Sequence, residues 1–159
     1  MFHVRVAGDD LTFSAAHFIT LGDGTCEPLH GHNYRIAAEV HGPLGPNQWV
    51  VDFLVLRNAV RSAIAELDHR TLLPTGHPAI RVTPGSEEVE VRFAQRRWVF
   101  PRADCVLLPV ANTTGELLAA YLAERVAGQL QQHTGARPAR LRIDLEECCG
   151  MTAVCELTA

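Results

Sequence analysis

Residues 11–42, LTFSAAHFITLGDGTCEPLHGHNYRIAAEVHG, combine two strand-like segments with a loop rich in reactive side chains. The segments LTFSAAH (11–17) and HNYRIAAEVHG (32–42) carry the alternation and the aromatic and β-branched content of strands. Glycines and a proline interrupt residues 18–29 between them. This stretch therefore predicts two strands that pair if the loop returns the chain to the same sheet.

The length and composition of the chain fit one globular domain. A chain of 159 residues can bury its own core without disulfides. Hydrophobic residues make up 47% of the sequence and charged residues 20%, values far from those of disordered chains. We therefore predict a single domain over residues 1–159.

Charge and hydropathy exclude several classes of function. A formal net charge of −4 argues against a nucleic-acid surface, which needs clustered excess Lys and Arg. No apolar run approaches the roughly 18 residues that span a bilayer, and the N-terminal residues lack a signal-peptide pattern. The five cysteines are an odd number without paired spacing, which favours reduced thiols. We expect a cytoplasmic protein that binds neither nucleic acid nor a membrane.

The rest of the chain predicts two helices and several strands. Apolar residues recur at helical spacing from about Leu54 to Leu67, and residues 68–78 end that helix. Thr114 is the expected N-cap of a second helix, with Glu116 in its first turn. Residues 83–109 form an extra hairpin in this prediction. The other predicted strands are 2–8, 49–53, 139–147 and 152–157, with turns at Gly8-Asp9-Asp10 and at Gln95-Arg96-Arg97.

This order of elements predicts an α+β fold with helices on one face of an antiparallel sheet. A four-stranded sheet with open edges often closes by assembling with copies of itself. We therefore expect a homo-oligomer.

His17, His30 and His32 form the strongest candidate metal site. His30 and His32 are two residues apart on a strand, so their imidazoles share one side of the sheet. His17 ends the strand expected to pair next to them. Three nitrogen ligands with an open fourth position are typical of catalytic zinc. The alternative interpretation is three ordinary strand histidines.

Cys26 and Glu27 lie in the loop before these histidines. A thiol near a bound cation ionises more easily and can act as a base or nucleophile. The alternative for Cys26 is a small buried hydrophobe, and for Glu27 a solvated carboxylate.

Three further acid or imidazole groups have open roles. Asp68 and His69 follow the first helix, where an aspartate can orient a proton-carrying imidazole or where both can cap the helix end. Glu147 ends a strand and is either an exposed carboxylate or an acceptor for a guanidine-like edge of a heterocycle.

These segments together resemble the 6-pyruvoyl-tetrahydropterin synthase and 6-carboxytetrahydropterin synthase family. The matching segments are FSAAH (13–17), CEPLHGHNY (26–34), VVDFLVLR (50–57), LDHRTLL (67–73), NTTGE (112–116) and LEE (145–147). The resemblance implies that Cys26 is the catalytic cysteine, assisted in proton transfer by Asp68 and His69. It also implies zinc on His17, His30 and His32. Pterin binding would fall to Glu147, with Thr114 and Glu116 near the pterin pocket.

The resemblance also implies a fold, a substrate and an assembly. The fold is the tunnelling fold, in which ββααββ subunits form barrels with active sites at subunit interfaces; a hexamer is the implied assembly. The implied substrate is 7,8-dihydroneopterin triphosphate. The leading expectation is 6-carboxytetrahydropterin synthase of the queuosine pathway, which releases acetaldehyde and triphosphate. The alternatives are 6-pyruvoyl-tetrahydropterin synthase, which only eliminates triphosphate, and a non-catalytic pterin- or metal-binding oligomer.

The chain departs from the family pattern at several points. The segment 74–111 is longer than the family pattern and adds the hairpin, on which Arg96 and Arg97 are either triphosphate ligands or a solvated tip. The usual P-T-x-E element reads TTGE here (113–116), and Cys155 stands at an expected aromatic position. Glu27 beside Cys26 resembles variants in which a glutamate replaces the cysteine, which leaves side-chain cleavage open as an activity.

Overall fold

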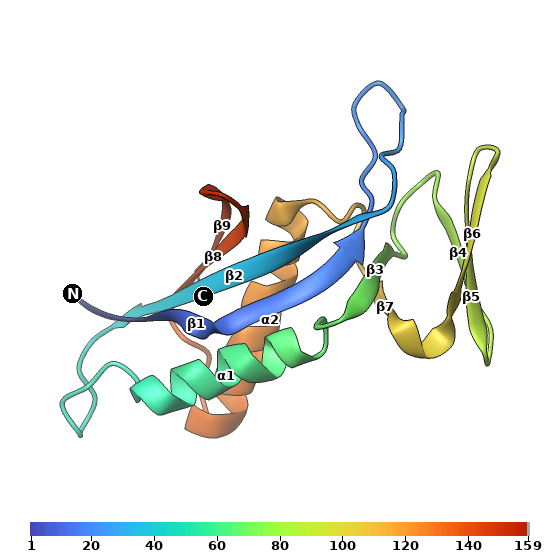
Figure 1. Cartoon of the computed structure of the whole chain (residues 1–159). Helices are drawn as coiled ribbons and strands as arrows, with labels where there is room; N and C mark the ends of the chain where they lie inside the picture. The colour runs from blue at the N-terminus through green and yellow to red at the C-terminus, as the bar shows by residue number, and fades with distance from the viewer. Residues whose placement is uncertain (159) are drawn as a thin grey trace.

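The computed structural model describes residues 1–158 and shows a main sheet, two helices on one of its faces and a small second sheet (Figure 1). The elements are β1 (Phe2–His17), β2 (His30–Gly42), α1 (Phe53–Ala65), β3 (Arg70–Pro74), β4 (Arg81–Pro84), β5 (Glu88–Phe93), β6 (Arg96–Pro101), a 3-10 turn (Arg102–Asp104), β7 (Cys105–Leu108), α2 (Gly115–Thr134), β8 (Arg140–Cys148) and β9 (Met151–Thr158). The described helices include none that is long and apolar enough to cross a membrane.

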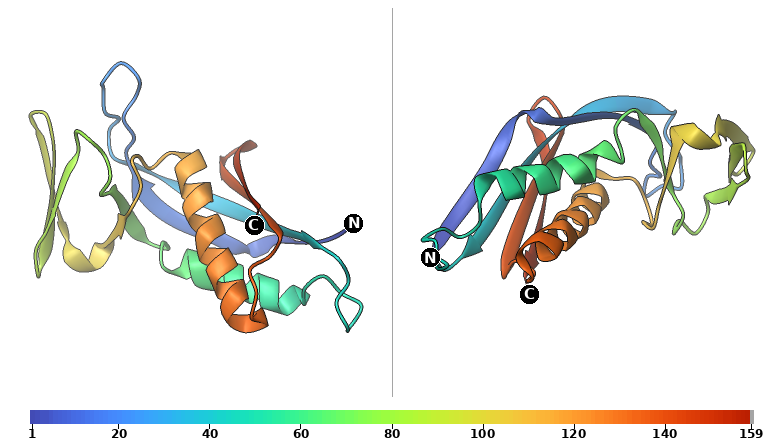
Figure 2. Two further views of the ribbon diagram at one scale, coloured as in Figure 1. Left: turned by 180° about the vertical axis from the view of Figure 1, so that it is seen from behind. Right: turned by 90° about the horizontal axis from the view of Figure 1, so that it is seen from below.

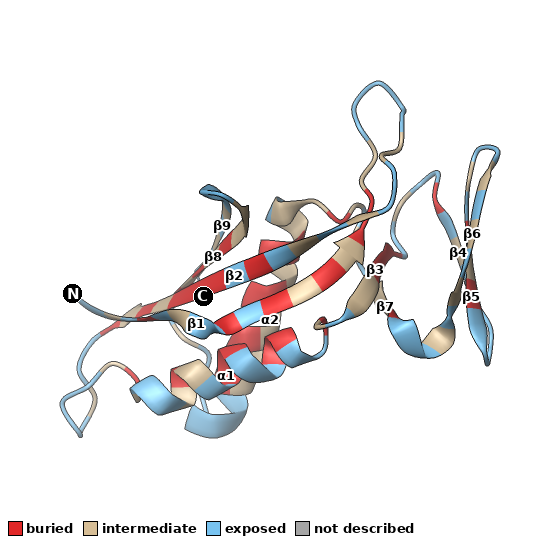
Figure 3. Cartoon of the chain, viewed as in Figure 1, coloured by how far each residue is buried: buried red, intermediate tan, exposed pale blue. Residues whose placement is uncertain are grey.

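Four antiparallel strands form the centre of the main sheet, in the order β1-β2-β8-β9. Helices α1 and α2 lie on the same side of this sheet (Figure 2). Their apolar faces pack on alternate strand residues, including Phe13, Tyr34 and Ile143, to make the main core (Figure 3). The predicted α+β architecture is confirmed.

Two short strands that pair in parallel extend this sheet, and neither was expected from the sequence as part of it. β3 pairs with the end of β1 at Ala15 and Ala16, and β7 pairs with β3. The segment expected only to end the first helix therefore contains a strand. The segment 105–108, expected in the hairpin, joins the main sheet instead. The sheet is mixed rather than wholly antiparallel, because parallel pairing between distant short segments leaves no turn signal nearby.

The extra segment is a three-stranded antiparallel sheet, β4-β5-β6, rather than a hairpin alone. The β5–β6 hairpin is confirmed, but its turn lies at Ala94 and Gln95, with Ala94 at a φ of 50°. Arg96 and Arg97 are therefore in β6 and not in the turn. A second core joins this sheet to the main one; it consists of Phe18, Leu73, Ile80, Val89, Val91 and Cys105.

Two other local predictions were wrong for identifiable reasons. Residues 49–53 are not a strand, because Asp52 is the N-cap of α1 and accepts hydrogen bonds from the Leu54 and Val55 amides (2.7 and 3.2 Å). Such a cap contributes about 1 kcal/mol to helix stability. Residues 8–10 do not end a strand, because β1 passes through an irregularity between Ala7 and Thr12 and continues.

Candidate metal and active site

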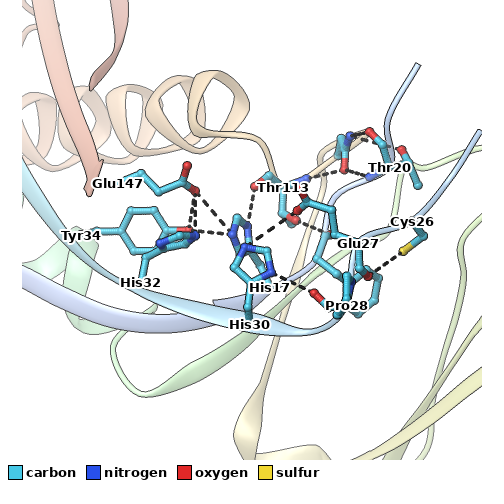
Figure 4. Close-up of polar contacts among 12 residues, drawn as sticks. His17, Thr20, Cys26, Glu27, Pro28, His30, His32, Tyr34, Thr113 and Glu147 are labelled. Atoms are coloured by element: carbon cyan, nitrogen blue, oxygen red, sulfur yellow. Dashed lines mark hydrogen bonds and ion pairs between the residues drawn. The ribbon is translucent and has the colours of Figure 1, made fainter. Parts of the chain in front are cut away.

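His17, His30 and His32 converge on the helix-covered side of the sheet. The β1–β2 register places His17 directly opposite His30, and His32 faces the same side two residues later. Their ring centroids lie 4.8 to 5.2 Å apart. One nitrogen of each ring lies within 4.8 Å of the corresponding nitrogens of the other two (Figure 4). The predicted cluster is therefore present in the folded chain.

Backbone carbonyls set the tautomer of two of these imidazoles. A carbonyl only accepts, so the Nδ1 atoms of His17 and His30 carry protons that they donate to Thr113 O (2.8 Å) and Pro28 O (2.9 Å). Nε2 then carries the lone pair that can bind a cation, although in His17 this atom also lies 3.4 Å from the Tyr34 hydroxyl. Burial lowers the pKa of His17, which favours its neutral form. Three imidazoles with converging ring nitrogens fit a zinc-type ion.

Thr113 holds the buried end of this cluster, a role that sequence reasoning did not assign. Its hydroxyl donates to Phe18 O (3.0 Å), while Asn112 accepts from the Thr20 amide (3.3 Å). The start of α2 is thereby tied to the end of β1. The predicted N-cap, Thr114, is confirmed in position without a side-chain cap bond, and Glu116 is exposed in the first turn of α2. A backbone acceptor such as Thr113 O leaves no signal in a sequence.

Glu147 lies beside the histidines rather than free at a strand end. Its Oε1 is 3.4 Å from His17 Nε2 and 3.6 Å from His32 Nε2. The hydroxyl of the fully buried Tyr34 donates to the same oxygen (3.3 Å). Burial, reinforced by this carboxylate, raises the pKa of Tyr34, so the phenol stays protonated and remains a donor. The site thus combines three imidazoles with one carboxylate.

The consecutive residues Cys26 and Glu27 face different surroundings. Glu27 Oε2 lies 3.8 Å from His30 Nε2, whereas the Cys26 side chain packs on the second core and its sulfur is 3.5 Å from the Glu27 carbonyl (Figure 4). Burial raises the pKa of the Cys26 thiol, and the charge of Arg96 opposes this effect. In this conformation the group directed at the histidines is a carboxylate.

Arg96 attaches the Cys26–Glu27 loop to the second sheet. Its Nη1 donates to Cys26 O (2.6 Å) and to Glu27 O (3.2 Å). Its guanidinium lies 4.6 Å from the centroid of the Trp98 ring, and Trp98 stacks on Phe18 at 4.7 Å. The neighbouring Arg97 instead pairs with Glu90 within the second sheet. Both arginines are thus engaged within the chain.

We expect Arg96→Ala to lower turnover by about 10-fold or more, because a loop that positions a reacting group loses rate steeply when displaced by about 1 Å. Arg97→Ala is the matched control, since it removes the same charge from the same strand without touching the loop. Steady-state kinetics of both variants, with thermal unfolding as a check of folding, make the comparison. Equal activities of the two variants would contradict a positioning role for Arg96.

Asp68 and His69 lie apart from this cluster within one chain. Helix α1 ends at Ala65; the Asp68 amide donates to Ile64 O (3.1 Å) at this helix end, while its carboxylate accepts from the Ser14 amide (2.9 Å). His69 has a φ of 56° and lies 3.0 Å from Asp68, with 82% of its side chain exposed. It lines a cavity of about 450 Å³ with Ser14 and residues that include Gly31, Asn33 and Asp104. Ser14 alternates with Phe13 and Ala15, so it faces away from the helices.

Comparison with known proteins decides the family. The family model for 6-pyruvoyl tetrahydropterin synthase matches residues 9–157. The chain belongs to the 6-pyruvoyl tetrahydropterin synthase family. Within the family it is 33% identical to a putative 6-carboxy-5,6,7,8-tetrahydropterin synthase of Methanocaldococcus jannaschii over 122 residues, 76% of this chain and 74% of the relative. It is 38% identical over 85 residues to a dihydroneopterin monophosphate aldolase of Pyrococcus furiosus, 54% of this chain and 68% of that protein.

Solved structures of the family share the fold. The 6-pyruvoyl tetrahydropterin synthase of Plasmodium vivax superposes with a TM-score of 0.91 at 22% identity, covering 99% of this chain and 98% of that one. A variant of the same Plasmodium protein, in which a glutamate is replaced by alanine, is described as a catalytic-residue mutant. The tunnelling-fold prediction is confirmed by this similarity.

Proposed function

We propose that this chain is a zinc-dependent lyase that converts 7,8-dihydroneopterin triphosphate to 6-carboxy-5,6,7,8-tetrahydropterin, releasing acetaldehyde and triphosphate. The observation that carries the proposal is the convergence of three imidazole nitrogens within 4.8 Å of one another. Family membership and the name of the Methanocaldococcus relative support the substrate class. The queuosine pathway follows as the proposed setting for this reaction.

The residues divide the chemistry between metal binding, proton transfer and substrate binding. Zinc on His17, His30 and His32 supplies Lewis-acid polarisation of the hydroxyl oxygens on the pterin side chain. A base in the Cys26–Glu27 loop removes the proton from the carbon next to the phosphate-bearing carbon. The triphosphate then leaves with the electrons of its carbon–oxygen bond. Water next adds to the side-chain carbon attached to the ring, the bond from this carbon to the two-carbon fragment breaks, and the fragment takes up a proton and leaves as acetaldehyde. The metal ligands and the base must act on adjacent atoms of one short side chain of the substrate. They therefore cluster in one loop and in the adjoining strand ends.

The pterin ring needs a polar anchor beside this site. Glu147 is the proposed anchor, because a carboxylate accepts two parallel hydrogen bonds from a guanidine-like edge. Its position beside His17 and His32 supports such a role next to the reacting side chain. Thr114 and Glu116 stay proposed as residues near the pterin pocket, at the start of α2.

Asp68 and His69 can take part in the proposed reaction only at the active site of a second copy of the chain. His69 lines its cavity with Ser14 and Asn33, which belong to the sheet face away from the helices. We therefore propose that a neighbouring protomer supplies Asp68 and His69 to each site, in a homo-oligomer that is a hexamer. The main sheet supports this proposal, because β9 is an edge strand and β1 meets β3 only at Ala15 and Ala16 in the described chain. The rest of β1 is therefore open to another strand.

A specific observation favours a second candidate, an aldolase-type cleavage of the dihydroneopterin side chain. Glu27 rather than Cys26 is directed at the histidines. The Pyrococcus relative is named an aldolase, and a glutamate is described as a catalytic residue in the Plasmodium protein. A carboxylate in this position can remove a hydroxyl proton, after which the adjacent carbon–carbon bond breaks and a carbonyl forms; the electron pair of that bond passes to the pterin ring, and the carbon left on the ring is then protonated.

Product analysis distinguishes the candidates. The zinc-loaded protein is incubated with dihydroneopterin triphosphate, and the products are followed by mass spectrometry. Triphosphate with acetaldehyde and a 6-carboxypterin is the expected result. Triphosphate without acetaldehyde would indicate the pyruvoyl synthase, and a phosphorylated aldehyde with a 6-hydroxymethylpterin would indicate the aldolase. Pterin binding without any turnover would indicate the non-catalytic alternative.

A further inference from the structure

A second cluster of metal-ligating side chains lies at the other end of β1 and β2. His3 pairs directly with His41 across the two strands, and Glu39 precedes His41 by two residues. All three side chains therefore share one face of the sheet. That face is the one away from the helices, because the alternate residues Val6, Ala38 and Val40 are in the main core. Figure 1 shows the start of β1 at the end of the sheet remote from β3, whereas the first histidine cluster lies where β1 ends and β2 begins.

The geometry of this cluster is that of a partly assembled metal site. One ligand atom from each of His3, Glu39 and His41 lies within 4.8 Å of those from the other two. The two imidazole centroids are 5.1 Å apart, and His41 and Glu39 have side-chain exposures of only 15% and 20%. Two histidines and a glutamate are a donor set that proteins use for zinc, with a remaining position for water.

His41 Nε2 carries the strongest indication that a ligand is missing. It lies 2.6 Å from Glu39 Oε1, but that oxygen is off the line of a hydrogen bond, and the buried nitrogen has no hydrogen-bond partner in the described chain. A buried nitrogen without a hydrogen-bond partner reduces the stability of the folded state. A cation shared by the lone pair of this nitrogen and the carboxylate removes that cost.

The neighbouring charges leave Glu39 available for a cation. Arg5 and Arg142 lie opposite Glu39 in the neighbouring strands, but the carboxylate nearest to each is that of Asp144 (3.6 and 2.7 Å). Arg140 pairs with Glu156 at 2.8 Å. These three arginines are balanced by Asp144, Glu156 and Glu39, so the face has no net positive charge that would repel a divalent ion.

We propose that His3, Glu39 and His41 form a second binding site for a divalent transition metal of the zinc class. The site bridges β1 and β2 at the open end of the sheet and is separate from the site proposed for catalysis. It does not depend on the proposed reaction, and its metal is expected to stabilise the pairing of the N-terminal part of β1.

Metal titration of purified, metal-stripped protein by calorimetry tests this proposal with Zn²⁺ as the probe. We expect two equivalents per chain for the wild type and one for His41→Ala. In a His30→Ala/His32→Ala background, which lacks the first cluster, one equivalent is expected to remain and to disappear when His41→Ala is added. Glu39→Gln, a substitution of the same shape, is expected to weaken this remaining binding by 10-fold or more. His133→Ala, at an exposed position of α2, is the control and is expected to change nothing.

Two results would overturn the second site. One is a single equivalent in the wild type that His41→Ala leaves unchanged. The other is the absence of zinc binding in the His30→Ala/His32→Ala background while circular dichroism shows a folded chain. Thermal unfolding with and without Zn²⁺ gives an independent reading, because a ligand that binds only the folded state raises Tm. In the His30→Ala/His32→Ala background, we expect Zn²⁺ to raise Tm and Glu39→Gln to abolish that rise.

Discussion

His30→Ala is expected to remove one bound zinc equivalent per chain and to lower triphosphate release by roughly a hundredfold or more. Two of the three converging nitrogens would remain, and two imidazoles hold zinc far more weakly than three. His30 is the ligand of choice for this test because its side chain is 37% exposed, whereas that of His17 is 2% exposed. Substitution of His17 would disturb packing as well as metal binding.

The test measures metal content by mass spectrometry and triphosphate release in the same preparation. His133→Ala serves as the control for removal of an imidazole from an exposed position. A His30→Ala protein that keeps its full zinc content and its full activity would show that the histidine cluster is not the catalytic metal site. Retention of zinc with loss of activity would instead assign His30 a role in proton transfer.

Cys26→Ala is expected to lower triphosphate elimination by about 10²–10⁴-fold while zinc content stays unchanged. The expectation rests on the loss of a base that reaches the substrate side chain without binding the metal. Cys26 is directed at the second core in the substrate-free chain, so this result also requires the loop to turn its thiol toward the substrate.

Glu27→Gln is the companion variant, because it keeps the shape of the side chain and removes only its charge. It is expected to lower triphosphate elimination less than 10-fold if Cys26 is the base. The reverse order of effects, with Glu27→Gln inactive and Cys26→Ala active, would contradict the role of Cys26 and favour the aldolase-type candidate. Rates and products of both variants, measured on the same substrate, decide between the two groups.

The central sheet and the histidine cluster could be predicted because both depend on strand alternation. A period of two places His30 and His32 on one face, and pairing of consecutive strands brings His17 opposite them. Thr114 and Asp52 belong to the residue types that cap helices, so both helix starts carry a signal in the sequence. The start at Thr114 was predicted, whereas Asp52 was expected in a strand.

The features that could not be predicted depend on loops and on distant parts of the chain. Consecutive loop residues such as Cys26 and Glu27 follow no period, so nothing local indicates which of them faces the metal cluster. The parallel pairs of β3 and β7 join segments with few residues and no connecting turn. Arg96 could not be assigned to the loop from the sequence, because the hairpin turns at Ala94 and Gln95 and not at the expected Gln95-Arg96-Arg97.

The most direct test of a metal-dependent elimination is the reaction of dihydroneopterin triphosphate with the zinc-loaded and the zinc-stripped protein, followed by mass spectrometry of all products. We expect only the zinc-loaded protein to consume the pterin and to release triphosphate. Equal consumption by the stripped protein, or no consumption by the zinc-loaded protein, would contradict a metal-dependent elimination at His17, His30 and His32.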